Sequence, residues 1–245
     1  METSIITKAE KVLRDFVSQI AGSLEGKPFI EEVTKRLKFE NESDWSTLCS
    51  LIDVLSDTEL AKENFFKYDL TGPTKIQDYG EQYLRLYGIT NAMYLQKSAI
   101  ETFVELVKLP NKKSELDKLN NSEIIRFRNI VGAHTVNFLE SDKKKNSFQF
   151  QRHFSKDGTI KTLDSKNTFK DYDLKKLIRE FNDIAEDIFI KALEKLVKTS
   201  LKNHTGNKKD FVLSKINALK EAYDQGFAVW PDVNEELFII KVKED

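Results

Sequence analysis

Two long stretches of this sequence repeat apolar residues at helical spacing, and they limit the fold more than any other feature. The first runs from Gln77 to Lys108 and stops before Pro110, and the second runs from Asp171 to Thr199. Apolar residues three and four positions apart share one face of an α-helix, so each stretch predicts a long helix with a buried face. Helices of this length need other helices to cover them. We therefore expect a mainly α fold, a helical bundle.

Shorter helices are expected before the first long one. Apolar spacing predicts them at residues 5–23, at residues 29–39 and from Ser43 to about Lys67. The next residues, Thr71 to Thr74, include Gly72 and Pro73, which interrupt helices strongly. We therefore expect residues 1–70 to form an N-terminal helical subdomain and residues 71–245 to form the main helical domain.

One internal segment, residues 147–163, departs from helical spacing. Phe148, Phe150 and Phe154 stand at alternate positions, residues 155–158 have the turn sequence Ser-Lys-Asp-Gly, and alternation resumes up to Leu163. Alternation of period two around a tight turn predicts a β-hairpin. The bundle is thus expected to carry a β-hairpin inserted between core helices. A last helix is expected from Lys208 to about Tyr223, followed by an extended tail.

Composition limits the location, the partners and the cofactors that we expect. The lone cysteine, Cys49, cannot form an internal disulfide, and no apolar run approaches the length of a membrane span. The N-terminus lacks a basic region followed by an apolar core, so we expect a cytoplasmic protein without membrane contact. The three histidines and the cysteine show no metal-ligand spacing, so neither a metal nor another cofactor is expected.

The most reactive side chains gather in the short apolar stretch from Ile124 to Thr135. It contains Arg128, Asn129 and His134, and the spacing of its apolar residues predicts a helix from about Asn121 to Leu139. A guanidinium is a permanently charged, forked clamp for phosphate. An imidazole exchanges a proton near neutral pH, and an amide can orient either group. The three residues together indicate chemistry on a phosphate.

This stretch resembles the motif of the HEPN superfamily. Its members are helical proteins with an Arg, four to six further residues and a His, often with Asn, Asp or His directly after the Arg. Here Arg128 and His134 are separated by five residues, and Asn129 follows the Arg. The segment from Tyr83 to Ala92 is also similar to the long helix that precedes the motif in bacterial HEPN-like proteins. The two similarities cover about residues 78–140.

Helix geometry leaves two interpretations of the motif open. In a regular helix, an offset of six places Arg128 and His134 about 120° apart around the axis and about 9 Å apart along it. In one interpretation His134 is a hydrogen-bonded core histidine, and Arg128 is a surface residue with a buried stem. In the other, which the resemblance implies, the site is assembled across a two-fold axis from two motif helices, and the protein is a homodimer.

The resemblance implies a metal-independent endoribonuclease of the kind found in bacterial toxin and phage-defence systems. His134 would act as general acid or base, Arg128 would stabilise charge on the phosphate, and Asn129 would orient one of them. The alternative is a non-catalytic HEPN-like helical module for nucleotide binding or protein interaction. Members silenced by nucleotidylation often carry a Tyr two residues after the His, where this chain has Val136, so that form of regulation is not expected.

RNA and an antitoxin or defence protein are the partners that the resemblance implies. The net charge of −1 argues against a surface that binds nucleic acid over its whole extent. A local basic surface remains open, and the candidate substrate-binding residues are Lys143, Lys144 and Lys145, together with Arg152 in the hairpin. Lysine runs in loops are usually solvated, which is the alternative for these four side chains.

Overall fold

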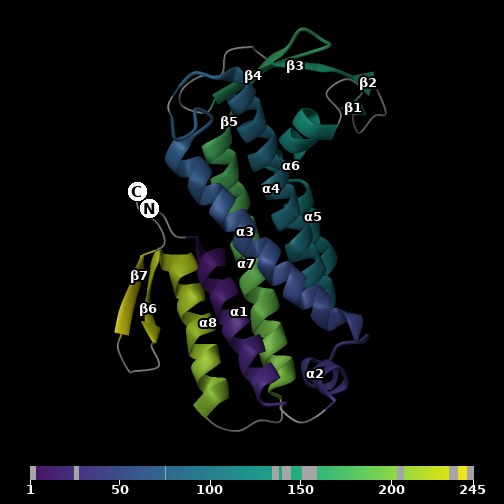
Figure 1. The fold of residues 1–245 in the computed structure, drawn as a ribbon, viewed down its shortest axis with the longest axis vertical. Helices are drawn as coiled ribbons and strands as arrows, with labels where there is room; N and C mark the ends of the chain where they lie inside the picture. The colour runs from purple at the N-terminus through teal and green to yellow at the C-terminus, as the bar shows by residue number, and fades with distance from the viewer. Residues whose placement is uncertain are drawn as a thin grey trace. The chain divides into compact units, whose positions relative to one another are not determined.

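The chain is mainly α-helical in the computed structural model, which describes residues 4–24, 28–74, 76–133, 138–139, 145–150, 159–202, 207–231 and 237–241 (Figure 1). The α-helices are α1 (Ile5–Gly22), α2 (Phe29–Leu37), α3 (Ser43–Tyr68), α4 (Tyr79–Leu106), α5 (Lys112–Asn120), α6 (Glu123–Arg128), α7 (Leu174–Ser200) and α8 (Asn207–Gln225). The mainly α helical bundle with a β-hairpin that the sequence predicts is confirmed. No helix in the described part of the chain has the length and apolar character needed to cross a membrane.

Three small antiparallel sheets accompany the helices. The first joins β1 (Phe138–Leu139) to β2 (Lys145–Asn146), and the last joins β6 (Phe227–Pro231) to β7 (Leu237–Lys241). The largest contains β3 (Phe148–Phe150), β4 (Thr159–Asp164) and β5 (Phe169–Asp173), with β4 in the middle. Phe150 pairs with Thr162, so β3 and β4 are the two strands of the predicted hairpin. Its predicted turn lies outside the described residues.

Two compact units are formed from separate stretches of the chain. The first comprises residues 1–57, 98–116 and 184–245, and the second comprises residues 58–97 and 117–183. The long helices α3, α4 and α7 therefore each contribute residues to both units. The sequence instead predicts two continuous subdomains that meet at residue 70, and this division stays a prediction.

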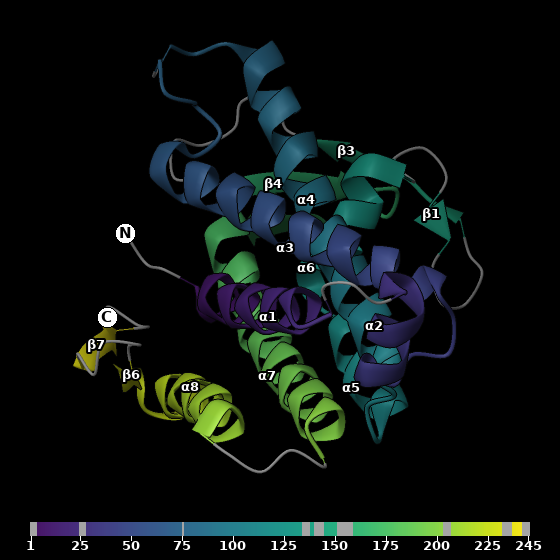
Figure 2. The same cartoon turned by 60° about the horizontal axis from the view of Figure 1, so that its bottom comes forward.

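In the first unit, α1 packs along α8, and its start is fixed by a carboxylate from α7 (Figures 1 and 2). The backbone N–H of Ile5 and the hydroxyl of Ser4 donate to Oε1 of Glu186, at 3.1 and 3.2 Å. Ser4 Oγ also accepts from the N–H of Ile6, as an N-cap does. A negative charge at a helix N-terminus is favourable, and it satisfies N–H groups that the helix itself leaves unpaired.

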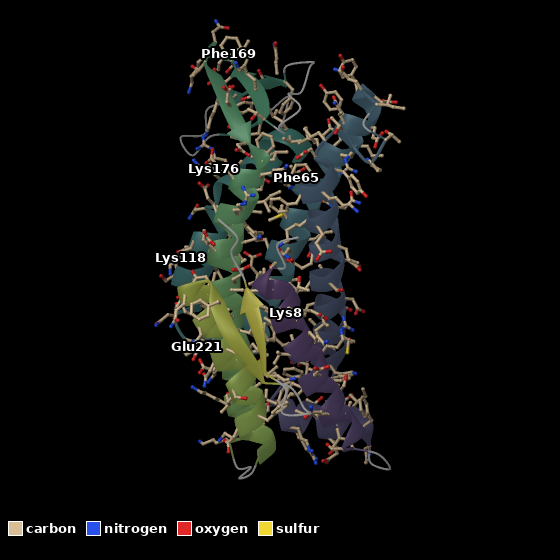
Figure 3. The ribbon with its side chains drawn as sticks, turned by 90° about the vertical axis from the view of Figure 1, so that its left-hand side faces the viewer. Lys8, Phe65, Lys118, Phe169, Lys176 and Glu221 are labelled. Carbon is tan, nitrogen blue, oxygen red and sulfur yellow. The ribbon has the colours of Figure 1, made fainter. Side chains whose placement is uncertain are left out.

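The second unit contains the motif helix and the three-stranded sheet. Phe127 of α6 is fully buried, and its ring lies 4.5 Å from that of Tyr172 on β5. Phe65 of α3 and Phe181 of α7 are further buried aromatic residues of this unit, whereas Phe169 at the start of β5 is exposed (Figure 3). The unit thus has buried aromatic residues in its core, among them Phe127, which directly precedes Arg128.

Two predicted boundaries are wrong. The helix expected from Asp171 begins at Leu174, because residues 169–173 form β5. A tight turn causes this: Oδ1 of Asp164 accepts from the N–H groups of Lys166 and Thr168, and Asn167 has a left-handed φ of 57°. Asp173 then accepts from the N–H of Lys176 and starts α7.

The motif helix is also shorter than predicted. It ends at Arg128, continues as a π-helical turn, η1 (Asn129–Ala133), and residues 138–139 form a strand instead of the helix end. Asn146 joins the end of β2 to the turn after β4, since its side-chain oxygen accepts from the backbone and hydroxyl of Ser165 and from the N–H of Ser147. Pairing with β2 therefore takes the place of helical continuation.

Candidate functional site

Arg128 and Asn129 lie where α6 changes into the π-helical turn. α6 begins after Ser122, whose extended backbone precedes the helix and whose hydroxyl donates to the carbonyl of Leu119 at 2.8 Å. Arg128 is the last residue of α6, where a positive charge suits the helix dipole. Asn129 is the first residue of η1. Single π-helical turns are rare and often occur at functional sites, because they redirect the side chains that follow.

The guanidinium of Arg128 is held on two sides. Its Nη1 donates to Oδ1 of Asn129 at 3.1 Å, and its Cζ lies 4.1 Å from the centre of the Tyr94 ring on α4. Within the described part of the chain it has no carboxylate partner. A guanidinium has five N–H donors, so most of them have no acceptor among the described residues. A half-buried cation in this condition is suited to bind an anion such as a phosphate or a carboxylate.

A second cation contacts the same tyrosine ring. The ammonium of Lys97 lies 5.2 Å from the centre of the Tyr94 ring and donates to Oδ1 of Asn120 at 2.8 Å. Lys97 is only 7% exposed, so its chain is packed while its charge is held by polar groups. The site therefore combines two cations, one aromatic ring and two amides. Lys97 and Asn120 are not among the candidate residues that the sequence indicates.

The sequence does not predict the contact between Arg128 and the α4 residues Tyr94 and Lys97. Tyr94 and Lys97 are three positions apart, and this spacing places them on one helix face. Their proximity to Arg128 is a tertiary contact between α4 and α6, which the spacing along the chain cannot reveal. The neighbouring Arg128 and Asn129 were identified from the sequence, and they are hydrogen-bonded. The role of Asn129 in orienting the guanidinium stays a prediction.

Several candidate residues cannot be placed relative to Arg128. His134, Lys143, Lys144 and Arg152 lie outside the described residues. The backbone of Lys145 forms the start of β2. The proposed roles of these five residues therefore remain predictions from the sequence.

An ion pair and aromatic contacts join α6 to β5. Lys170 on β5 forms an ion pair with Glu123 of α6, and its ammonium lies 4.7 Å from the centre of the Tyr172 ring. Burial chiefly raises the pKa of the Tyr172 phenol, and Glu123 adds to the rise while Lys170 opposes it. The phenol is thus protonated at neutral pH. These contacts join α6 to the sheet and give Arg128 a fixed base.

The single cysteine, Cys49, gives no sign of chemistry. Burial chiefly raises the pKa of the Cys49 thiol, Asp53 raises it further and Arg14 lowers it, so this thiol is a poor nucleophile at neutral pH. This agrees with a packing role for Cys49. Among the residues that the structure describes, no group of three or more His, Cys, Asp or Glu side chains could hold a metal ion.

Relatives do not identify the site. Comparisons with protein-family models, with curated proteins and with solved structures found no match to this chain, so its resemblance to the HEPN superfamily depends on the motif and on the segment from Tyr83 to Ala92.

Proposed function

We propose that this protein is a metal-independent endoribonuclease of the HEPN type. The observation that supports this best is the state of Arg128, a half-buried guanidinium held between the ring of Tyr94 and the amide of Asn129, with most of its donors unpaired among the described residues. Such a group meets a negatively charged phosphate without reorganising, and preorganised donors are the largest contribution to many enzymatic rates. The type of reaction is inferred from the resemblance of the motif to that of the HEPN superfamily.

In this reaction the RNA supplies its own nucleophile. The 2′-oxygen of a ribose attacks the adjacent phosphorus, the bond from phosphorus to the 5′-oxygen breaks, and the products carry a 2′,3′-cyclic phosphate and a 5′-hydroxyl. His134 would take the proton from the 2′-hydroxyl or give one to the leaving oxygen. Arg128 would stabilise the charge that develops on the phosphate oxygens. No metal-activated water is required, and DNA would be resistant because it lacks the 2′-hydroxyl.

The wider proposal includes a homodimer that acts in the cytoplasm. Two motif helices facing each other would form one composite site. Lys143, Lys144, Lys145 and Arg152 would contact the RNA backbone. A role in a toxin or phage-defence system, controlled by an antitoxin or another defence protein, would fit a nuclease of this kind.

The alternative is a non-catalytic HEPN-like module that binds a nucleotide or a protein. The stacking of Arg128 on Tyr94 supports this alternative, because a cation–π contact also stabilises the packing of α6 against α4 without any catalytic role. In such a protein the two cations at Tyr94 would hold an anionic ligand without cleaving it.

A cleavage assay with matched controls tests the proposal. A 5′-labelled, mixed-sequence single-stranded RNA is incubated with the protein in EDTA, beside the same sequence as DNA and as 2′-O-methyl RNA. We expect only the unmodified RNA to be cleaved. His134→Ala should slow cleavage by about 100- to 10,000-fold, and Arg128→Ala by about 100- to 1,000-fold.

Arg126→Ala and His204→Ala are the matched controls. Arg126 is exposed on the same helix, two residues before Arg128, and its loss should leave the rate within about twofold. Cleavage of the 2′-O-methyl RNA would contradict the proposed nucleophile. RNA binding without cleavage, weakened by Arg128→Ala, would instead support the non-catalytic module.

A further inference from the structure

One face of α4 is apolar, uncharged and exposed in the single chain. Leu84 is 72% exposed, Tyr87 47% and Leu95 44%, and Gly88 and Asn91 are exposed between them. Tyr87 and Gly88 are adjacent, and the other successive members of this set are three or four residues apart, so the five residues form a continuous stripe along the helix. We call these five residues the α4 stripe.

The opposite face of this helix segment is buried. Leu86, Ile89 and Met93, on that face of α4, are at most 4% exposed. Arg85 and Tyr94, beside the stripe, are partly exposed. About a third of this chain is charged, at 32%, yet every exposed residue between positions 84 and 95 is neutral. An exposed apolar surface of this kind marks a contact site.

The chemistry of the stripe limits what can cover it. Nucleic acid and anionic membrane surfaces are recognised by cations, and the stripe has none. An apolar helix is the complementary surface, and the order of residues in the stripe makes it complementary to itself. When two copies run antiparallel about a point between Gly88 and Asn91, Leu84 of each copy meets Leu95 of the other. Gly88 of each then meets Asn91 of the other.

Gly88 leaves room at the centre of this arrangement. A Cβ atom placed on it would meet no atom of its own chain within 4 Å, so the space in front of it is open to a second helix. Large residues at the ends and the smallest one near the centre allow the two backbones to approach closely, at an interaxial distance of about 8–10 Å. We propose that the α4 stripe is the contact face of a homodimer in which two α4 helices pack antiparallel about a two-fold axis.

This dimer also has a consequence for the candidate site. Tyr94, which holds Arg128, directly precedes Leu95 and lies at one edge of the stripe. A two-fold axis perpendicular to antiparallel helices keeps this edge on the same side in both copies, with the two Tyr94 residues about 14 Å apart along the helix direction. Both Arg128 side chains would then lie on one surface. This step rests on the proposed function, which needs a composite site; the contact face itself does not.

The mass in solution, measured by sedimentation at micromolar concentration, tests the interface. We expect the wild type to be a dimer. The double variant Leu84→Lys/Leu95→Lys places like charges opposite each other and should weaken the dimer by at least about 100-fold. The double variant Leu84→Lys/Leu95→Glu places opposite charges at the same contacts and should restore the dimer. Leu60→Lys, at a leucine of α3 that is 61% exposed, is the matched control and should remain dimeric.

Three results would overturn the interface. The first is a monomeric wild type, whose stripe would then contact another protein or none. The second is a double lysine variant that remains dimeric. The third is a lysine–glutamate variant that remains monomeric. Circular dichroism of each variant shows whether it is folded. A dimer that does not cleave RNA would contradict the proposed function but not the proposed interface. A monomer whose RNA cleavage depends on His134 would contradict the interface but not the proposed function.

Discussion

At the scale of single residues, the orientation of Arg128 depends on a neighbour that is distant in the sequence. The Tyr94 ring covers one face of the guanidinium, and Asn129 holds one of its nitrogens. An arginine side chain free in solution would have to be ordered each time it met a phosphate, at a cost in conformational entropy. In the proposed reaction Tyr94 would therefore be a positioning residue, which acts on the phosphate through Arg128.

Replacing the ring separates this role from simple packing. Tyr94→Leu should lower the rate of RNA cleavage, or the affinity for RNA if the protein does not cleave it, by about 3- to 30-fold, since a cation–π contact contributes about 0.5–2 kcal/mol. Tyr94→Phe keeps the ring face and should retain activity. In steady-state kinetics the loss should fall mainly on kcat, because Arg128 acts on charge that develops during the reaction.

Tyr79→Leu is the control for this experiment. Tyr79 is also on α4, where its hydroxyl accepts a hydrogen bond from Gln77 far from the motif. It should behave as the wild type. If Tyr94→Phe and Tyr94→Leu are equally impaired, the hydroxyl rather than the ring is needed. If both are fully active, Tyr94 does not position Arg128.

At the scale of the elements, α3, α4 and α7 are connected by a buried polar network in the second unit. Lys62 lies 2.5 Å from Glu59, and both side chains are at most 5% exposed. The ammonium of Lys62 also donates to the side-chain oxygens of Gln96 on α4 and Asn182 on α7. Gln96 in turn donates to Glu59 at 2.5 Å. Each buried charge is thus hydrogen-bonded, as burial of charge requires.

Breaking this network should lower the free energy of unfolding much more than replacing an exposed lysine of the same helix. Lys62→Ala leaves the carboxylate of Glu59 buried without its cation, and should lower the free energy of unfolding by about 3–5 kcal/mol. The double variant Glu59→Leu/Lys62→Met removes both charges and should recover most of that loss. Urea unfolding followed by circular dichroism measures both.

Lys67→Ala, at an exposed lysine of the same helix, should change the free energy of unfolding by less than about 0.5 kcal/mol. A Lys62→Ala variant as stable as Lys67→Ala would show that the charge of Lys62 does not hold the three helices together. A double variant less stable than the single one would show that the polar network is needed for packing as well as for charge balance.

The elements also show which parts of the fold a sequence can predict. The long helices have an apolar period over many turns, so α4 and α7 were found with small errors at their ends. β5 was missed because only Tyr172 among its five residues is buried, which leaves no alternation to detect. The π-helical turn at Asn129 has no residue pattern of its own. The helical wheel drawn for Arg128 and His134 therefore assumed a regular helix that the backbone does not form.

At the scale of the whole molecule, charge has to be considered by region. The sequence has 39 Lys and Arg residues against 40 Asp and Glu residues, so the surface as a whole would attract a polyanion such as RNA only weakly. Several lysines are also paired with carboxylates, such as Lys108 with Glu40 and Lys112 with Glu105. The proposed RNA binding would then depend on local basic residues, and the run Lys143, Lys144 and Lys145 is the main candidate.

Charge reversal of this run tests that dependence through salt. The logarithm of the RNA binding constant should fall linearly with the logarithm of salt concentration, with a slope of about −0.7 for each phosphate contact on single-stranded RNA. Changing all three lysines to Glu removes up to three contacts. The affinity should fall, and the slope should become shallower by about 2, because fewer counterions are released on binding. Fluorescence anisotropy with a labelled RNA at several salt concentrations gives both quantities.

The matched control changes three exposed lysines elsewhere, Lys11, Lys67 and Lys202, to Glu. It alters the net charge by the same amount, so it measures the general repulsion of RNA by a more acidic protein. General repulsion lowers the affinity of both variants and leaves the number of phosphate contacts unchanged. Only the loss of direct contacts makes the salt slope shallower. If the two variants show the same affinity and the same slope, the run from Lys143 to Lys145 is a solvated surface, and the RNA backbone must be held by other residues.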